Sequence, residues 1–188
     1  MKTTLLTLGI AFASAIALQG AVLTDLDGNF EKIDKKGLPV KWRVNMGTKM
    51  AAQLKISVTK DDKGVNTLTV DAAGTPKNDV PWMGPHIRCK AGDKIIVSAD
   101  VKTSGSFGFS FYRYADGKKP LMKGMKAKTF RIMNRKTTVK AEFIMTDDAD
   151  KKLYLVKPVL IMPKGKVTSI SNVKYELITA EELKAEKK

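Results

Sequence analysis

The sequence predicts an all-β fold, an antiparallel sandwich or barrel, and three observations lead to this prediction. Apolar residues recur at every second position between residues 22 and 178, as they do on the buried face of a strand. Turn-forming Gly, Asp and Pro residues separate these apolar runs at regular spacing. No long stretch keeps the period of 3.6 residues that marks a helix, so about ten short strands are expected to follow one another directly.

The chain begins with a pattern typical of a secretory signal peptide. The first two residues supply a positive charge, and residues 5–18 form an uncharged apolar run. Ala15-Ile16-Ala17 fits the small-residue cleavage rule, and Gly20-Ala21 offers a slightly later site. A membrane anchor is the alternative, but the run is shorter than the ~20 residues that span a bilayer. We therefore expect residues 1–21 to be a signal peptide, cleaved between residues 17 and 21, and the mature chain to be secreted or to lie in the periplasm or cell envelope.

The strands fill a single domain that we expect at residues 22–178. The run 95–102 is long and apolar enough to be a central, buried strand. In the next strand three phenylalanines share one face, and Tyr112 and Tyr114 share the other. The apolar runs are 54–58, 67–71, 95–102, 107–114, 130–132, 139–145, 153–162 and 167–178.

Residues 179–188 form a charged tail after the last strand. Thr179 and Glu182 resemble a capping box, which predicts a short helix at its start. A frayed end is the alternative, because so many of its side chains are charged.

The composition excludes several classes of function. A single Cys rules out an internal disulfide framework, and a single His rules out a multi-His metal site. The formal net charge is +15, but 29 of the 34 basic residues are Lys, whereas specific recognition of bases or phosphates usually relies on Arg. We expect a monomer that binds no nucleic acid and does not insert stably into a membrane. Cys89 is expected to be a buried thiol, because Ile87 shares its strand face.

Three stretches of the sequence resemble the motifs of one family. Asp27-Gly28-Asn29-Phe30-Glu31 followed by Gly37-Leu38-Pro39-Val40-Lys41-Trp42 resembles an opening NGxFE…GxPxxW motif. Residues 90–102 resemble a central xxGxxYxxSxxVK strand pair, and residues 165–177 a closing GxVxIDxVxL strand. In this order and spacing they resemble carbohydrate-binding modules of the family 4 and family 9 kind, with a galactose-binding-like jelly-roll fold. The resemblance implies a two-sheet sandwich whose first and last strands lie near each other.

The resemblance also implies a structural calcium ion near the joined termini. Glu31 matches the Glu of the opening motif, and Asn172 stands where the closing motif usually has Asp. An amide in place of a carboxylate weakens a calcium site, although Asp25 and Asp27 are near enough in sequence to compensate. The expected cofactor is therefore a calcium ion at these four residues or none. In the alternative interpretation Glu31 caps a turn.

Sugar recognition needs flat aromatic faces and a few polar groups that hold the hydroxyls. Trp82 lies in a Pro/Gly segment that is predicted to be a loop, where it either stacks on a ligand or plugs the loop inward. Tyr112 and Tyr114 point to a groove or to the other side of their sheet, with Arg113 on the alternate face. Trp42 stands between two valines of a strand and is expected in the core.

Nine basic residues and no acidic one lie between residues 118 and 140. The middle of this segment, residues 121–126, is predicted to be a loop that exposes methionines. It forms either a solvated Lys-rich surface or a patch that binds polyanions. The candidate ligand-binding residues are Trp82, Tyr112, Arg113, Tyr114, Lys123, Lys126, Arg131 and Arg135.

The sequence argues against an enzyme. A nucleophilic site would need His86 and Cys89, which lie three residues apart and so point to opposite faces of a strand. No carboxylate pair stands in a recognisable catalytic motif. We expect an exported, non-catalytic module that binds a polysaccharide or glycan, with a preference for acidic or sulfated chains. The alternative is a structural or protein-interaction β-sandwich of the cell envelope that does not bind sugar.

Overall fold

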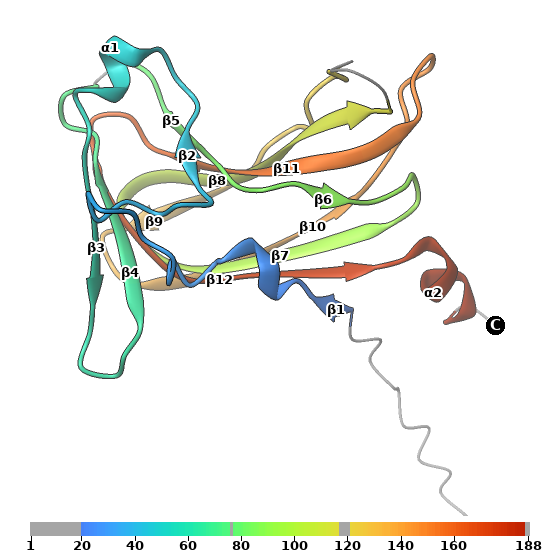
Figure 1. Ribbon diagram of the computed structural model, residues 1–188, viewed down its shortest axis with the longest axis horizontal. Helices are drawn as coiled ribbons and strands as arrows, with labels where there is room; N and C mark the ends of the chain where they lie inside the picture. Colours follow the sequence, from blue (N-terminus) through green and yellow to red (C-terminus); the bar gives the residue numbers. More distant parts are fainter. Residues whose placement is uncertain (1–19, 76, 117–120, 187–188) are drawn as a thin grey trace, which may run out of the picture.

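The computed structural model describes residues 20–75, 77–116 and 121–186, and in these ranges two antiparallel sheets of six strands lie one above the other (Figure 1). The fold prediction of an antiparallel two-sheet β-sandwich is confirmed. The lower sheet, here the β12 sheet, has the order β10 (Thr137–Ile144), β7 (Lys94–Lys102), β12 (Val167–Ile178), β4 (Asn66–Asp71) and β3 (Lys55–Lys60), with β1 (Ala21–Val22) also beside β12. The upper sheet, here the β11 sheet, has the order β2 (Arg43–Val44), β5 (Val80–Met83), β11 (Leu153–Met162), β8 (Ser104–Ala115) and β9 (Lys128–Met133), with β6 (Ile87–Arg88) also beside β11.

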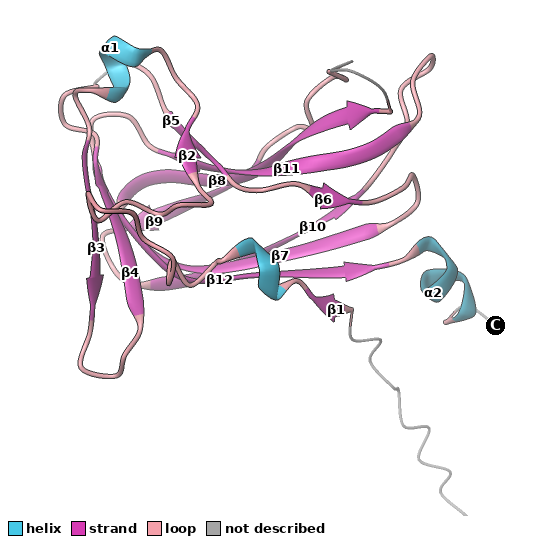
Figure 2. Ribbon diagram, viewed as in Figure 1, coloured by secondary structure: helices cyan, strands magenta, loops and turns pink. Residues whose placement is uncertain are grey.

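Helices are short in the part of the chain that the structure describes (Figure 2). They are η1 (Thr24–Leu26), α1 (Thr48–Ala51) and α2 (Ala180–Ala185). Thr179 and Glu182 form a reciprocal capping box at the start of α2, so the short helix predicted there is present. Among the described residues, no helix has the length and apolar character needed to cross a membrane.

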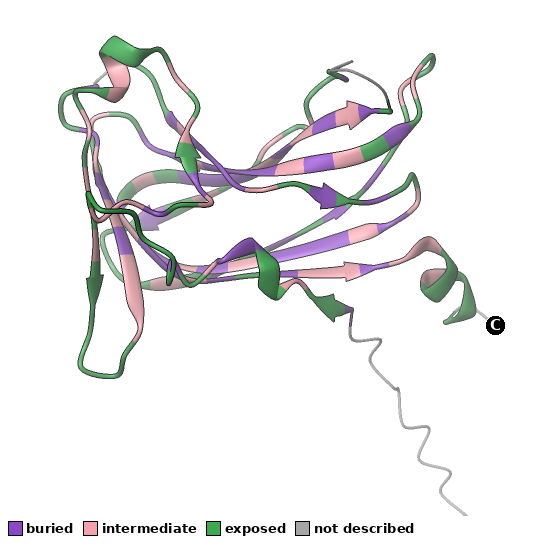
Figure 3. Cartoon of the chain, viewed as in Figure 1, coloured by how far each residue is buried: buried purple, intermediate pink, exposed green. Residues whose placement is uncertain are grey.

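The core lies between the two sheets, where the purple strand segments of Figure 3 face one another. β8 buries Phe107, Phe109 and Phe111 on one face, each at most 1% exposed. The ring of Phe111 packs edge-on against Phe143 of β10 at 5.0 Å and against Tyr175 of β12 at 6.4 Å. These aromatic contacts join the two sheets, because β8 belongs to one and β10 and β12 to the other.

The N-terminal segment crosses from the β12 sheet to the β11 sheet along one side of the sandwich (Figure 1). It starts as β1, which pairs with β12, so the first and last strands are neighbours as the family resemblance implies. It ends at β2, which pairs with β5. Trp42 is 2% exposed, stacks on Tyr175 at 6.3 Å and donates its indole N–H to the Leu26 carbonyl at 2.8 Å. The prediction that Trp42 is a core residue is confirmed.

The described part of the chain begins just before β1, at the end of the predicted signal peptide. Gly20 is buried, and a Cβ on it would lie 2.6 Å from Ile178. Ala21 pairs with Leu177 of β12. The first residue of β1 thus falls within residues 1–21, the range predicted for the signal peptide. The predicted signal peptide otherwise falls on residues outside the described ranges.

Cys89 is 6% exposed, so the prediction of a buried thiol is confirmed. Burial, together with the negative charge of Asp93, raises the pKa of Cys89 to about 12. A thiol that stays protonated is a poor nucleophile. Cys89 therefore acts as a small apolar side chain of the core.

A tight turn after η1 fixes the N-terminal segment to β12. Asp27 and Phe30 both have positive φ, and the Asp27 carboxylate accepts the backbone N–H of Glu31 at 2.9 Å. The Gly28 carbonyl accepts the backbone N–H of Val173 at 3.3 Å. A Cβ on Gly28 would lie only 2.0 Å from the Val173 carbonyl oxygen, so only glycine fits here.

Gly28→Ala should destabilise the protein by about 2–4 kcal/mol, because the added methyl forces the turn away from β12. Thermal or urea unfolding measures the change. Gly47→Ala is the matched control, since a Cβ there would approach nothing closer than Met50 at 3.8 Å. Equal stability of the two variants would contradict the close contact.

Candidate functional site

Two tyrosines of β8 lie on the outer face of the β11 sheet. Tyr112 and Tyr114 alternate with the buried phenylalanines, and both are partly exposed. They thus lie opposite the phenylalanine face, as the sequence predicts. Ser110 lies on the same side and donates its hydroxyl to the Met125 carbonyl at 2.8 Å, which holds the segment after β8 along the strand.

Polar groups from three other strands or their flanking turns surround these rings. Lys157 of β11 pairs in register with Tyr112, and its Nζ lies 5.6 Å from the centroid of the Tyr114 ring. Asn45, just after β2, donates its amide N–H to the Tyr112 hydroxyl at 3.2 Å. The His86 ring, just before β6, meets Tyr114 edge-on at 6.2 Å. Together with Arg43 of β2 these residues form what we call the tyrosine face: Arg43, Asn45, His86, Tyr112, Tyr114 and Lys157.

Positive charge gathers at the tyrosine face, and none of its six residues is acidic. Val44 pairs with the buried Trp82, so the preceding Arg43 points outward. Burial first, and then the charges of Lys157 and Arg43, lower the pKa of His86 below 6.5. Burial and the charge of Arg43 likewise lower the pKa of Lys157. A bound anion would relieve this mutual repulsion of cations.

The prediction that Trp82 lies in a ligand-binding loop is wrong. It belongs to β5, pairs with Leu160 of β11 and is 2% exposed. The Pro81 carbonyl points toward β2 and accepts the backbone N–H of Asn45. The ring nitrogen of Pro81, which has no hydrogen to donate, points to the same side. The strand tolerates this proline because β2 has only two residues and needs no hydrogen bond from it. Trp82 is a core residue and cannot stack on a ligand.

The prediction that Arg113 binds a ligand is also wrong. Arg113 is 5% exposed and follows the three phenylalanines on the inner face of β8. Its guanidinium donates to the Asp148 carboxylate at 2.6 Å, to the Lys123 carbonyl at 2.8 Å and to the Thr146 carbonyl at 2.7 Å. The backbone N–H of Lys123 donates to the Asp148 carboxylate, and this hydrogen bond is the main reason that the pKa of Asp148 is lowered. The charge of Arg113 lowers this pKa further. Arg113 therefore ties the segments after β8 and after β10 to the sheet.

Arg113→Met should destabilise the fold by about 2–4 kcal/mol, because it breaks the ion pair with Asp148 and leaves the Lys123 and Thr146 carbonyls without their donor. Thermal unfolding measures the loss, and amide exchange should speed up at residues 121–126 and 146–148. Arg131→Met, at an exposed arginine of β9, should change stability by less than about 0.5 kcal/mol. Unchanged exchange at both segments would contradict the bridging role.

The segment 121–126 continues along β8 instead of forming a free loop. Leu121 bridges to Tyr114, and Met122 donates its backbone N–H to the Arg113 carbonyl at 2.9 Å. Met122 is 3% exposed, so the prediction that it is an exposed methionine is wrong. A Cβ on Gly124 would lie 4.0 Å from the Tyr112 ring, which places the segment beside the tyrosine face.

Four predicted basic residues differ in their distance from the tyrosine face. Lys123 and Lys126 are exposed on either side of Gly124 and so flank Tyr112. Arg131 pairs with Ser106, six residues before Tyr112 on β8, or about 20 Å along the strand. Arg135 is exposed in the turn between β9 and β10. Lys118 and Lys119, of the same predicted patch, lie outside the described residues.

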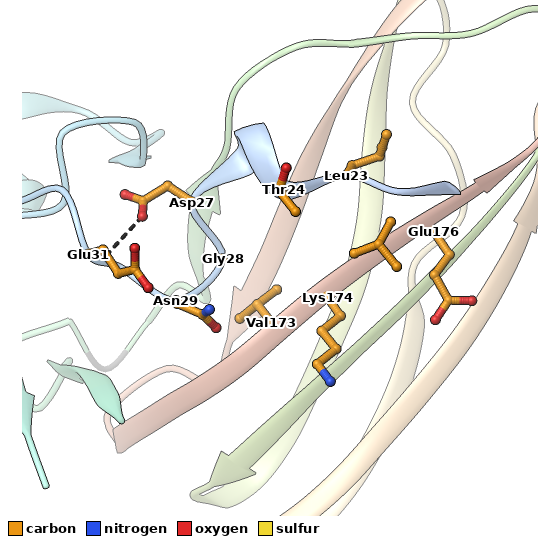
Figure 4. A pocket seen from close by; sticks show the side chains of 10 residues that line it. Leu23, Thr24, Asp27, Gly28, Asn29, Glu31, Val173, Lys174 and Glu176 are labelled. Carbon is orange, nitrogen blue, oxygen red and sulfur yellow. Dashed lines mark hydrogen bonds between the residues drawn. The ribbon is translucent and has the colours of Figure 1, made fainter. Parts of the chain in front are cut away.

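Two of the four residues named for calcium, Asp27 and Glu31, line a cavity of about 440 Å³ between the N-terminal segment and β12 (Figure 4). Asp27 and Glu31 line one side, but the Asp27 carboxylate accepts two backbone N–H groups, from Glu31 and Lys32. Lys174 brings a positive charge to the other side. The cavity is thus lined by carboxylates and an ammonium group together.

Asn172 does not line this cavity, and its amide donates to Asp100 of β7 at 2.9 Å. In the described residues, no three His, Cys, Asp or Glu side chains are arranged to hold a metal ion. Asp25 is exposed on η1, where its backbone carbonyl accepts from Lys41. Of the four residues named for calcium, only Asp27 and Glu31 thus share the cavity, and the calcium site stays a prediction that calcium titration tests directly.

Four residues of the tyrosine face were missed by sequence reasoning, and Asn45 is one of them. Arg43, His86 and Lys157 come from separate parts of the chain, and only strand pairing brings them together. One signal was available: each stands on a strand or next to one, in a position that alternates with a buried neighbour. Strand order, however, cannot be read from that alternation.

No known protein family matches the sequence, and no curated protein matches it. Solved structures do. A CBM4 carbohydrate-binding module is 16% identical with a TM-score of 0.53, and the match covers 81% of this chain and 98% of that one. The CBM22-1 xylan-binding domain of Xyn10C from Paenibacillus barcinonensis is 14% identical with a TM-score of 0.53, covering 87% and 98%. A Stig cyclase, Fisc, from Fischerella sp. TAU is 15% identical with a TM-score of 0.54, covering 81% and 95%.

These likenesses establish a β-sandwich of the kind found in carbohydrate-binding modules, over most of both chains. At such low identity they concern the fold alone. Since a cyclase shares this fold with sugar-binding modules, the function has to be argued from the surface of this chain.

Proposed function

We propose that this protein is an exported, non-catalytic module that binds an acidic glycan on its tyrosine face. The observation that carries the proposal is the pair Tyr112 and Tyr114, partly exposed side by side on an outer sheet face amid cationic and amide groups. The carbohydrate-binding-like fold supports the substrate class.

The chemistry of the face suits a sugar chain. Tyrosine rings offer apolar faces for the C–H groups of a pyranose, while the nearby amide and ammonium groups can hold its hydroxyls. Two rings at alternate positions of one strand are spaced by about 7 Å, which suits successive contacts along an extended chain. Asn45 orients the first ring through the Tyr112 hydroxyl.

The charge of the face favours an acidic glycan. Arg43 and Lys157 repel each other there, and Lys123 and Lys126 add two exposed ammonium groups at its flank. A uronate or sulfate group would be attracted to all four. The high formal net charge of +15 would draw the same ligands from a distance.

The proposal assigns no catalysis to this face. Its six residues include no carboxylate, whereas glycoside hydrolysis uses a pair of them. We propose that the protein acts as a monomer outside the cytoplasm, in the periplasm, in the cell envelope or in the medium.

Tyr114→Ala and Tyr112→Ala should each weaken glycan binding roughly tenfold or more, because each removes a stacking surface. Binding is measured on a glycan array and then by titration calorimetry with polygalacturonate, heparin and neutral xylan. Tyr112→Phe is the matched control, which keeps the ring and loses only the hydroxyl bonded to Asn45. Lys140→Gln, on the opposite sheet, controls for the loss of one charge.

Retention of acidic glycans should fall steeply as salt is raised. If the tyrosine variants bind as tightly as the unaltered protein, the tyrosine face is not the binding site. No signal with any neutral or acidic glycan would instead support a structural or protein-interaction module.

Binding of an acidic glycan should strengthen roughly three- to tenfold from about pH 7.5 to about pH 5.5. In the free protein, burial and nearby cations keep the pKa of His86 below 6.5, so the imidazole is neutral at pH 7. A bound anion favours the charged imidazolium, so binding takes up a proton and affinity rises as the pH falls. Calorimetry at several pH values measures this, and His86→Gln should flatten the profile. A profile that His86→Gln leaves unchanged would assign the pH dependence elsewhere.

A further inference from the structure

The outer face of the β12 sheet carries an unusual row of hydroxyl groups. Strand pairing aligns Ser57 of β3 with Thr69 of β4, and Thr69 with Ser169 of β12, whose hydroxyl lies 3.2 Å from that of Thr69. In a neighbouring row, Ser171 of β12 pairs with Asp100 of β7, and Asp100 with Thr138 of β10. This face lies on the opposite side of the sandwich from the tyrosine face (Figure 1).

A small pocket of about 160 Å³ opens within these rows. Its volume is well below the roughly 300–1,000 Å³ of drug-sized sites, so it suits a single ring or a comparably small group. It is lined entirely by polar or charged residues: Thr67, Asp100, Lys102, Lys136, Ser169 and Ser171.

Ser171 is a polar group of this pocket that lacks a partner. It is only 2% exposed, yet it lines the pocket. Within the described residues its hydroxyl makes no hydrogen bond, whereas Thr69 and Ser169 satisfy each other. Because Ser171 lines the pocket, its hydroxyl is available to donate to or accept from a ligand hydroxyl.

Asp100 is held in a fixed orientation at the wall. One carboxylate oxygen accepts the Thr138 hydroxyl at 2.6 Å, and the other accepts the Asn172 amide at 2.9 Å. Lys136 lies 3.4 Å from the second oxygen. Burial alone would raise the pKa of Asp100, but these hydrogen bonds and the Lys136 charge lower it overall. The carboxylate is thus ionised at neutral pH and has lone pairs left to accept further hydrogen bonds.

The polar groups of the pocket match a ligand that both donates and accepts hydrogen bonds. A sulfate ion suits the pocket less well than a sugar, because it has no hydrogen to donate to the Asp100 carboxylate. A sugar hydroxyl can donate to Asp100 while a neighbouring hydroxyl accepts from Lys102 or Ser171. Lys102 is exposed and makes no ion pair within the described residues, so it can also meet a sugar carboxylate.

We propose that this pocket is a second carbohydrate site, which binds one sugar unit through its hydroxyls on the face opposite the tyrosines. It relies on hydrogen bonds to Asp100, Lys102 and Ser171 and uses no aromatic stacking. A uronic acid unit should bind more tightly than the corresponding neutral hexose, because Lys102 meets its carboxylate. The site stands independently of the function proposed for the tyrosine face.

The experiment is a titration of isotope-labelled protein with methyl glucuronide and with methyl glucoside, followed by amide chemical shifts. Shifts are expected at residues 100, 102, 169 and 171, with the glucuronide the tighter ligand. Ser171→Ala should weaken binding at these residues roughly three- to tenfold, as expected for one lost hydrogen bond. Lys102→Gln should remove the preference for the glucuronide.

Two controls separate this site from the tyrosine face. Ser57→Ala removes a hydroxyl of the same sheet face outside the pocket and should leave the shifts at residues 100–102 and 169–171 unchanged. Tyr114→Ala should also leave them unchanged, even if glycan binding at the tyrosine face is lost or never found. Absence of shifts at these residues with both sugars, or shifts that Ser171→Ala leaves at full strength, would overturn the proposal.

Discussion

The alternation of side chains along β8, anchored by its buried phenylalanines, is the constraint on which the candidate site depends. Phe107, Phe109 and Phe111 fill the space between the sheets, and the contacts of Phe111 reach the opposite sheet at β10 and β12. A shift of one residue would expose these rings and bury the tyrosines, so the register is strongly specified. With that register, Tyr112 and Tyr114 must face outward, and the partner strand brings Lys157 to them. Burial of the phenylalanines of β8 therefore decides which of its side chains lie on the outer face of the β11 sheet.

The same alternation produces a different surface on the other sheet. β4, β7 and β12 bury Val and Ile side chains and present Ser, Thr and Asp in the intervening positions. An irregularity in the pairing of β12 with β7 between Ser171 and Lys174 includes Asn172, which has positive φ and bonds to Asp100. The sandwich thus offers an aromatic, cationic face and a hydroxyl-rich face, and a glycan-binding module with both would be able to contact two parts of one chain or two chains.

Several of the basic residues do not contribute to the tyrosine face. Arg113 holds the segments after β8 and after β10 against the sheet through its hydrogen bonds. Arg131 and Arg135 lie far from Tyr112 and Tyr114. What distinguishes the tyrosine face is that Arg43, His86 and Lys157 lie close together there; burial, and then the charges of these neighbours, lower the pKa of His86 and of Lys157. A few cations held close to aromatic rings are more informative about a partner than a net charge of +15.

The sequence by itself determined the longer strands and which residues of β8 share a face, because these follow from a period of two along one strand. The choice of a two-sheet sandwich over a barrel came from the family resemblance. It also placed Trp42 and Cys89 in the core. Only the tertiary structure decided that Trp82 is buried and that Arg43, His86 and Lys157 meet at Tyr114. The physical reason is that strand order and register depend on contacts between residues far apart in the chain, whereas alternation is local.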